Sequence, residues 1–464
     1  MSVSTQSAHP SALMYPLPIR RLRDVLARVL PNDTLTSVTQ VPSTRLAALY
    51  TLTFTSTRRL TLTLAPSPVV SLLRHEHRGL TSEVALVTFV RDTLKLGPPS
   101  ASSLAEHKAT SPPSTLSSPA SREREGKVSV SKLAPEPVNF LSRLVPALLR
   151  HGSNTKEIGY PYTIYDMITG DTLSTLSIYL SLPERRHLDI QIGNFVRQLA
   201  LLTSPNGKFG TLIGVCGDPS RSPTQTADGS GADNGTSRWL TAFRSLMEGI
   251  LRDGEDMAVL LPYAEVRAHF ARLSWRFDDV KIPRLVVLDA DDDNNLLIER
   301  DPEDLTRPLA SDTVRVTGLR DWSQGYFGDP LLSSVFEQPS EAFLVGWEGD
   351  HAGSNDGLPT DLIQDQDSVY ARMLLYKCYR AIVVIVTQYY RPHPDSSRRE
   401  LEGRRTLTST LADLERTHTS TDDRGKRPRS SSRSDAGETS KRKRLSRSNL
   451  ASSVVPKAAA DTLE

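Results

Sequence analysis

Two hydrophobic periods alternate along the first part of the chain. Residues 18–30 carry apolar side chains at helical spacing, with Leu22, Val25 and Leu26 on one face, which predicts an amphipathic helix. Three runs rich in Thr, Leu and Val then alternate with a period of two and predict antiparallel strands. They are Leu35–Val41, Leu46–Thr55 and Leu60–Leu64, with Arg58-Arg59 in the last turn and helical spacing again over Leu80–Leu94.

Longer helical patterns dominate after residue 137, where the apolar run Val138–Leu149 begins. Tyr160–Ile168 has the composition of a strand and is followed by the turn Thr169-Gly170-Asp171. Further strands are predicted at Leu285–Leu288, Leu296–Ile298 and Thr313–Leu319. Helices are predicted at Leu188–Leu202, Ser237–Leu251, Tyr263–Leu273 and Gln366–Arg391, and Arg398–Leu414 is either one more helix or a fraying end.

Two carboxylates and an amide stand out because each follows an apolar run. Asp289 and Asn294 come after Leu285–Leu288, and Asp321 follows Thr313–Leu319. In phosphoryl transfer from ATP, one carboxylate orients and deprotonates the attacking hydroxyl, while an amide and a second carboxylate hold Mg²⁺ on the phosphates. The alternative interpretation is a solvated acidic turn, since turns rich in Asp and Asn are common between strands.

Several short motifs support the first interpretation. The most specific is Asp321-Trp322 followed by Gly328-Asp329-Pro330, and the others are Leu64-Ala65-Pro66, Ser82-Glu83-Val84, Tyr160-Pro161-Tyr162 and Thr169-Gly170-Asp171. With them the chain resembles the aminoglycoside phosphotransferase (choline-kinase-like) family, particularly its fungal branch, over residues 20–95 and 155–391. The resemblance implies a two-lobed α+β fold like that of protein kinases. A small antiparallel-sheet N-lobe would span residues 18–96, and a hinge with a mainly helical C-lobe would span residues 138–415.

The same resemblance implies ATP and Mg²⁺ as cofactors and a small-molecule hydroxyl as the acceptor. Asp289 would be the catalytic base, Asn294 and Asp321 the Mg²⁺ ligands, and Glu83 the helix carboxylate of the N-lobe. The remaining positions concern the nucleotide: Ile164, Tyr165, Asp166 and Met167 would form the hinge beside adenine, and Thr63 stands where a phosphate-binding lysine is expected.

Three positions depart from the pattern of that family. Leu60–Leu64 contains no lysine, Val287 replaces a histidine two residues before the catalytic Asp, and Asp293 replaces the glycine before the Asn. A cation near the phosphates offsets their charge, whereas extra carboxylates work the other way. Two functions therefore stay open: a small-molecule phosphotransferase, and a catalytically degraded kinase-like protein that serves as a binding or regulatory module. A third, weaker interpretation is a nuclear scaffold whose folded part only positions the C-terminal tail.

Composition restricts the remaining classes of function. The chain has 464 residues and a formal net charge of +2, so no global field selects nucleic acid. Its two cysteines, Cys216 and Cys378, exclude a disulfide framework and a cysteine-based zinc site. No apolar run approaches the length of about 20 residues that a membrane helix needs, so we expect a soluble protein without membrane contact.

Three segments are compositionally unlike the rest. Residues 1–17 and 97–137 are predicted to be a disordered start and a flexible insertion. The tail 416–464 holds ten Lys or Arg and two acidic residues between Arg424 and Arg447. Its two clusters, Lys426–Arg429 and Lys441–Arg444, resemble a bipartite nuclear localisation signal that would bind an import receptor. The expected location is cytoplasmic and/or nuclear, and the alternative is a solubilising tail.

Overall fold

The computed structural model of the chain describes residues 17–43, 45–95, 137–219, 235–300, 314–349 and 362–422. The chain divides into a compact unit, residues 1–418, and a second unit, residues 419–464, of which residues 419–422 are described. The predicted disorder of 1–17 and 97–137 and the predicted basic tail 416–464 fall outside the described residues except at their edges. None of the described helices is long and apolar enough to cross a membrane.

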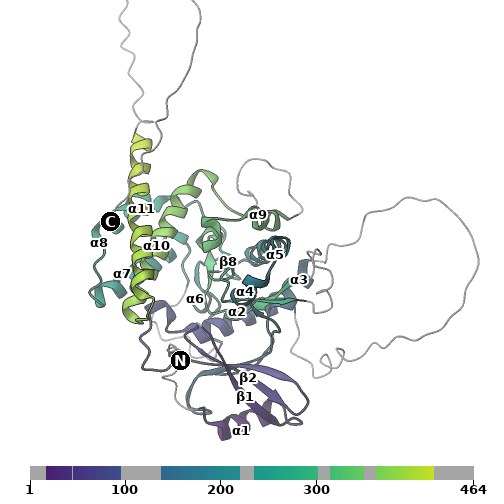
Figure 1. Cartoon of the computed structure of the whole chain (residues 1–464). Coiled ribbons are helices and arrows are strands. Elements are labelled where there is room, and N and C mark those ends of the chain that lie inside the picture. The colour runs from purple at the N-terminus through teal and green to yellow at the C-terminus, as the bar shows by residue number, and fades with distance from the viewer. Residues whose placement is uncertain are drawn as a thin grey trace, which may run out of the picture. The chain divides into compact units, whose positions relative to one another are not determined.

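The N-lobe is built on an antiparallel sheet in the order β1-β2-β3-β5-β4. One face of the sheet packs on α1 (Ile19–Val29), which lies beside β1 and β2 in Figure 1. The buried stripe of α1, Leu22, Val25 and Leu26, forms one hydrophobic cluster with the sheet, as its helical spacing predicts. The strands are β1 (Leu35–Val41), β2 (Ala48–Phe54), β3 (Arg59–Leu64), β4 (Leu148–Gly152) and β5 (Tyr162–Asp166).

Alternation along β3 and β5 separates the two faces of this sheet. Leu62 and Ile164 belong to the cluster with α1, whereas Tyr165 belongs to the larger core that includes α2 (Gly79–Thr93). Thr63 pairs with Thr163, two residues before Tyr165. Because side chains alternate across a strand, Thr63 and Tyr165 lie on the face toward α2.

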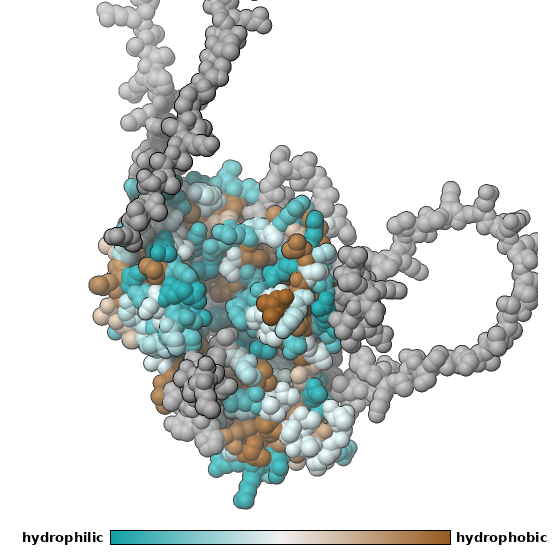
Figure 2. Space-filling model, in the orientation of Figure 1, coloured by the Kyte–Doolittle hydropathy of each residue, from teal (hydrophilic) through white to brown (hydrophobic). Residues whose placement is uncertain are grey.

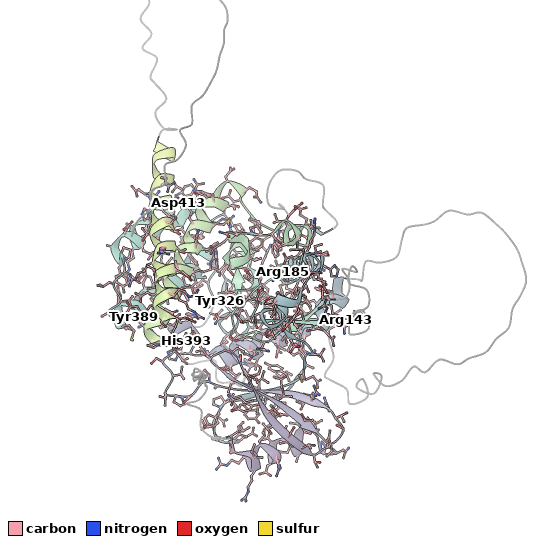
Figure 3. The ribbon with its side chains drawn as sticks, viewed as in Figure 1. Arg143, Arg185, Tyr326, Tyr389, His393 and Asp413 are labelled. Carbon is pink, nitrogen blue, oxygen red and sulfur yellow. The ribbon has the colours of Figure 1, made fainter. Side chains whose placement is uncertain are left out.

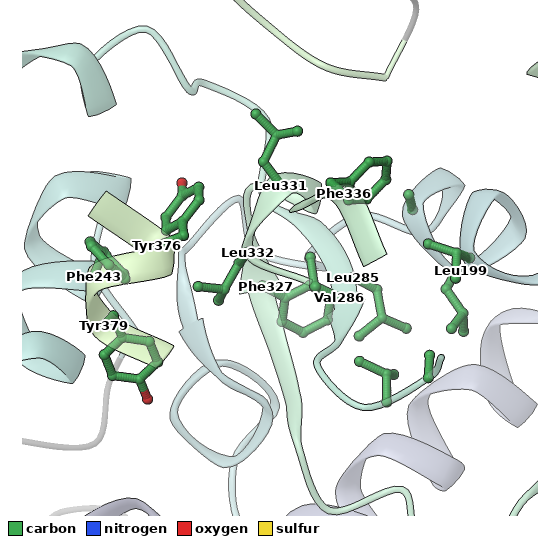
Figure 4. Packing of buried hydrophobic residues seen from close by; sticks show 14 of the residues in the cluster. Leu199, Phe243, Leu285, Val286, Phe327, Leu331, Leu332, Phe336, Tyr376 and Tyr379 are labelled. Carbon is green, nitrogen blue, oxygen red and sulfur yellow. The ribbon is translucent and has the colours of Figure 1, made fainter. Parts of the chain in front are cut away.

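The C-lobe is mainly helical and contains two further small sheets, β10-β9-β6 and β7-β11-β8. Its core lies between α5, β8, β11 and α10, where Leu199, Leu285, Phe327 and Tyr376 are buried (Figure 4). The helices are α3 (Pro137–Leu144), α4 (Leu173–Leu176), α5 (Leu182–Leu201), α6 (Leu212–Cys216), α7 (Trp239–Asp256), α8 (Tyr263–Leu273), α9 (Glu341–Glu348), α10 (Val369–Tyr390) and α11 (Ser396–Asp422). The strands are β6 (Asp171–Thr172), β7 (Gly210–Thr211), β8 (Arg284–Val287), β9 (Leu296–Arg300), β10 (Val314–Leu319) and β11 (Gly325–Gly328).

Most predicted elements are confirmed, and the differences have local causes. The apolar run 138–149 is not one element but the helix α3 followed by β4. The helix predicted at 188–202 begins earlier, at Leu182, because Ser181 and Glu184 form a reciprocal capping box at a polar first turn. The segment after residue 398 is a helix, α11, whose Leu407, Leu411 and Leu414 are buried.

Candidate active site

Asp289 lies in the turn between β8 and β9. Its Oδ1 atom is buried and has no hydrogen-bond partner among the described residues. Burial raises the pKa of the Asp289 carboxyl well above its ordinary value, and the nearby charge of Asp321 raises this pKa further. A buried carboxylate without a partner is costly, so this oxygen is a candidate for binding a cation or accepting a proton.

Asn295 holds the turn of Asp289 against the turn of Asp321. Its Nδ2 donates to the carbonyl oxygens of Asp289 and Asp321, both at 3.0 Å, and its Oδ1 accepts from the backbone N–H of Asp321 at 2.6 Å. The backbone N–H of Arg320 also donates to the carbonyl oxygen of Asn295 at 2.8 Å. Asn295 is 6% exposed, so these bonds tie together the two turns, β8 to β9 and β10 to β11, that connect the two small sheets.

Asn294, the amide predicted as a metal ligand, is placed differently. Its side chain is exposed, and its Nδ2 donates to Oδ1 of Asp292 at 3.1 Å. The structure therefore puts the side chain of Asn295, and not that of Asn294, between the backbones of the two turns that carry Asp289 and Asp321.

Asp321 follows β10 and reaches toward the N-lobe. Its Oδ1 accepts from the backbone N–H of Ser323 at 2.8 Å, and its neighbour Trp322 is buried edge-to-face against Phe195 of α5. The buried indole anchors the turn in the core. Asp321 lies close enough to Asp289 for its charge to raise the pKa of that carboxyl, and their common role in one site stays a prediction.

Arg45 is a cation that faces Asp321 and Glu83. No sequence pattern predicted this position for it. It lies in the connection between β1 and β2, with its side chain 7% exposed. Its Nε donates to Oδ2 of Asp321 at 2.8 Å, its Nη2 to Oε2 of Glu83 at 3.3 Å, and its Nη1 to the carbonyl oxygen of Arg320. One guanidinium therefore joins the N-lobe helix α2 to the turn after β10.

Glu83 is the helix carboxylate of the N-lobe, as predicted, but its partner is not on β3. Its side chain is 3% exposed. Burial raises the pKa of Glu83 to about 7, with Arg45 opposing the shift and Asp321 adding to it. Thr63, at the position where the lysine was expected, is 1% exposed, and its Oγ1 has no hydrogen-bond partner in the described part of the chain.

The predicted hinge residues point in different directions. Ile164 is fully buried in the cluster with α1, so its side chain is turned away from the face that carries Thr63. Tyr165 lies on that face. Asp166 pairs with Arg58 at 2.7 Å, and Met167 follows β5 and is half-buried. Only Tyr165 of the four brings its side chain to the core shared with α2.

The donor set suits a magnesium ion held together with a nucleotide. No group of three or more His, Cys, Asp or Glu side chains in the described residues is placed to hold a metal. Magnesium, however, is commonly bound by one or two carboxylates plus the phosphates of a substrate. Asp321 and the unpartnered oxygen of Asp289 provide two such carboxylates, and the amide of Asn295 binds backbone groups of both turns. The residues present therefore fit the expected cofactor.

The Gly-Asp-Pro motif supports the site from the core. Asp329 is fully buried and accepts hydrogen bonds from Arg372 and, at 2.7 Å, from the hydroxyl of Tyr376. That hydroxyl in turn accepts from the indole N–H of Trp239 at 2.7 Å. A Cβ on Gly328 would lie 2.5 Å from the Trp239 ring, so only glycine fits there. The motif fixes β11, the neighbour of β8, against α7 and α10.

Two residues of the site were missed by the sequence interpretation. Asn295 could have been found from its position immediately before the apolar strand Leu296–Ile298. Arg45 had no local signal, because it is one of several arginines in the N-terminal part and lies far from its partners in the chain.

No protein-family model and no curated protein matches the chain. Among solved structures it is similar to a protein from Ralstonia eutropha JMP134 that is provisionally assigned as an aminoglycoside phosphotransferase. The identity is 10% and the TM-score 0.50, over 86% of this chain and 99% of that one.

Two weaker likenesses are to the gentamicin complex of APH(2")-IIa and to choline kinase from Cryptosporidium parvum. The first has 13% identity and a TM-score of 0.44, over 86% of this chain and 99% of that one. The second has 8% identity and a TM-score of 0.42, over 88% and 97%. The likeness to the Ralstonia structure agrees with the sheet order and the helices described above. The chain therefore has a two-lobed, kinase-like α+β fold, with an antiparallel-sheet N-lobe and a mainly helical C-lobe.

Proposed function

We propose that the chain is an ATP- and Mg²⁺-dependent phosphotransferase that acts on the hydroxyl of a small molecule. The observation that carries this proposal is the joining of Asp289 to Asp321 through Asn295, opposite the pair formed by Arg45 and Glu83. Carboxylates, an amide and a cation converge at the boundary of the two lobes, which is the set of groups that phosphoryl transfer uses.

Asp289 is the group that would accept the proton of the attacking hydroxyl. Its carboxyl is buried and its pKa is raised, which makes it a stronger base than an exposed Asp once it is ionised. Asp321 would hold Mg²⁺, and Asn295 would keep the turn of Asp321 in place. The ion, when bound, would neutralise phosphate charge and orient the terminal phosphoryl group. The side chains of Arg45 and Glu83 are almost inaccessible to solvent, which would keep water from competing as acceptor.

The acceptor would approach from the side of α4 and the acidic turn. The carbonyl oxygen of Asp293 accepts from the N–H of Ser174 at 2.8 Å, and its carboxylate lies 3.5 Å from Arg185, which Figure 3 marks on α5. Ile178, Tyr179 and Leu182 follow α4 and are 79%, 65% and 87% exposed. On the face shown in Figure 2, hydrophobic residues form separate areas among hydrophilic ones. An acceptor with an apolar part would suit the surface beside α4 and the acidic turn, where these three hydrophobic side chains are exposed.

A second candidate function is a kinase-like binding module without catalysis. It is favoured by the direct ion pair between Arg45 and Asp321, which engages a predicted metal ligand, and by Val287 and Thr63 in place of the expected histidine and lysine. The two candidates differ in whether Asp289 matters for turnover.

Thermal unfolding of the full chain with and without Mg²⁺ and ATP separates these possibilities. A ligand that binds only the folded state at a concentration of about 100 times its Kd stabilises it by about 2.7 kcal/mol. We expect such a shift for the native chain and for the control Asp24→Ala on the exposed face of α1, and its loss in Asp321→Ala. No shift of the native chain at millimolar ATP would exclude the phosphotransferase. A shift without phosphate transfer to any hydroxyl in a substrate panel would favour the binding module.

The basic tail belongs to a separate proposal. Its two clusters, Lys426–Arg429 and Lys441–Arg444, would bind a nuclear import receptor through charge, since such runs suit an acidic groove. A fluorescent fusion of the full chain should accumulate in nuclei, and removal of residues 423–464 should abolish this. Equal distribution of both forms would identify the tail as a solubilising segment.

A further inference from the structure

The strand that should carry a phosphate-binding lysine, β3, has none. Thr63 on β3 is buried with an unpartnered hydroxyl, and Leu60–Leu64 contains no lysine. A nucleotide triphosphate brings several negative charges, and one divalent ion does not neutralise them fully. A chain that binds such a ligand at this site therefore needs a cation from elsewhere in the fold.

Arg45 occupies the position from which that charge can act. It contacts Glu83 on α2 and Asp321 after β10, and its charge lowers the pKa of Asp289 against the effect of burial. The charge of a single guanidinium therefore acts on three carboxylates of the site, those of Glu83, Asp321 and Asp289. Its charge is too small to balance all three, which leaves room for a divalent cation beside it.

Arg45 also has unused donor capacity. A guanidinium has five N–H groups, and the hydrogen bonds to Asp321, Arg320 and Glu83 use three of them within the described residues. The backbone around it is anchored, since the N–H of Arg45 donates to Oγ of Ser43 at 3.1 Å and Arg320 donates to the carbonyl oxygen of Pro42 at 3.4 Å. The remaining N–H groups can make the paired, charge-assisted hydrogen bonds that arginine forms with phosphate oxygens.

We propose that Arg45 is the phosphate-binding cation of this site, supplied by the β1–β2 connection in place of the lysine that β3 lacks. The guanidinium holds Glu83 in position, and it would contact the phosphates of a bound nucleotide. This inference rests on the proposed function, because it assigns a residue to the nucleotide of that reaction. A purely structural role for Arg45, as a tie between the lobes, is the competing explanation.

Calorimetric titration of the full chain tests the proposal without measuring catalysis. Adenosine and the β,γ-imido analogue of ATP, the latter with Mg²⁺, are titrated into the native chain, Arg45→Gln, Arg45→Lys and the double variant Arg45→Gln/Thr63→Lys. Arg28→Gln is the control, because Arg28 pairs with Glu157 in the same lobe and is 58% exposed. Adenosine reports the base site alone, and the analogue reports the phosphates as well.

We expect Arg45→Gln to weaken binding of the analogue about ten- to hundredfold, the worth of hydrogen bonds to a charged group, and to leave adenosine binding unchanged. Arg45→Lys should retain part of the affinity, since it keeps the charge and loses the paired geometry. The double variant should recover affinity by returning a cation to β3. Arg28→Gln should bind both ligands like the native chain.

Two results would overturn the assignment of Arg45 while leaving the proposed function intact. One is an Arg45→Gln variant that binds the analogue as tightly as the native chain. The other is an equal loss for adenosine and the analogue, which would indicate a structural role only. If the native chain binds neither ligand, both the function and this assignment fail. If Arg45→Gln does not fold, Arg45→Gln/Glu83→Gln removes the unpaired carboxylate and takes its place in the titration, with the same expected loss.

Discussion

Asn295 binds Asp321 through both ends of its amide: its Oδ1 accepts from the backbone N–H of Asp321 at 2.6 Å, and its Nδ2 donates to the carbonyl oxygen of the same residue at 3.0 Å. This two-point attachment joins the strand β9 to the turn after β10 at the place where the candidate carboxylates meet. Asn294, on the exposed side of the same turn, hydrogen-bonds Asp292 instead.

Asn295→Ala should destabilise the fold by about 3 kcal/mol, because it leaves the N–H and the carbonyl group of Asp321 without the amide and removes one of the two bonds to the carbonyl of Asp289. It should also abolish stabilisation by Mg²⁺ and ATP, since Asp289 and Asp321 lose their common support. Urea denaturation measures the first effect and thermal unfolding with ligand the second. The neighbouring Asn294→Ala is the matched control and should change stability by less than about 0.5 kcal/mol. Equal losses in the two variants would contradict the placement of the amide.

Asp289→Asn separates stability from catalysis. The native carboxyl is buried with one unpartnered oxygen and a raised pKa, so its removal should leave the free energy of unfolding unchanged or increase it. Phosphoryl transfer should fall about a hundredfold or more, the usual contribution of a positioned general base. Turnover assays and urea denaturation of the same preparation check both parts. The control variant Asp292→Asn, in the exposed part of the turn, should transfer phosphate at the native rate. An Asp289→Asn variant with native turnover would leave the binding module as the better description.

Glu83 should make stability depend on pH. Burial raises its pKa from 4.5 to about 7 in the folded chain, so the folded state holds more protons than the unfolded state between these values. The contribution of Glu83 to the free energy of unfolding is therefore largest below about pH 4.5. It is lost as the pH rises through about 7, and the loss amounts to about 3 kcal/mol for this shift. The groups that set the shift are Arg45 and Asp321, with Tyr165 nearby.

Urea denaturation across this pH range should show a shallower slope for Glu83→Gln than for the native chain. Some slope should remain, because burial also raises the pKa of Asp291 to about 6. Glu157→Gln is a suitable control, since the hydroxyl of Tyr162 lowers the pKa of Glu157 and its contribution has the opposite sign. Identical slopes in the native chain and Glu83→Gln would mean that Glu83 is ionised throughout the range.

Arg372→Met should cost about 3–5 kcal/mol of stability, the usual effect of leaving one member of a buried ion pair without its partner. Arg372 and Asp329 are both fully buried, and the same Asp329 carboxylate accepts from Tyr376. Arg380→Met, on the same helix, breaks a pair with Glu337 whose partners are 20% and 27% exposed, and should cost less than about 1 kcal/mol. Denaturant unfolding of both variants measures the two losses of unfolding free energy. Similar losses would show that the buried ion pair of Arg372 and Asp329 contributes no more to stability than a partly exposed pair.

Local patterns account for much of what the sequence predicted correctly. The period-two runs of β1, β2 and β3 and the helical stripe of α1 each specify a face to bury, so their existence follows from residues close together in the chain. Elements with weak local patterns were missed. β11, Gly325–Gly328, is a short strand that exists because it pairs with β7 and β8, and α5 begins before its apolar stripe because of a cap at Ser181.

The sequence by itself determined the kinase-like order of elements, the two carboxylates Asp289 and Asp321, and the Gly-Asp-Pro motif that supports them. The tertiary structure decided which amide faces inward, since Asn294 and Asn295 are chemically identical and only the path of the turn distinguishes them. The tertiary structure also placed the cation Arg45 beside Asp321, from which it is separated by 276 residues along the chain. No periodicity or propensity encodes such a contact; it arises when the β1–β2 connection of one lobe lies against a turn of the other.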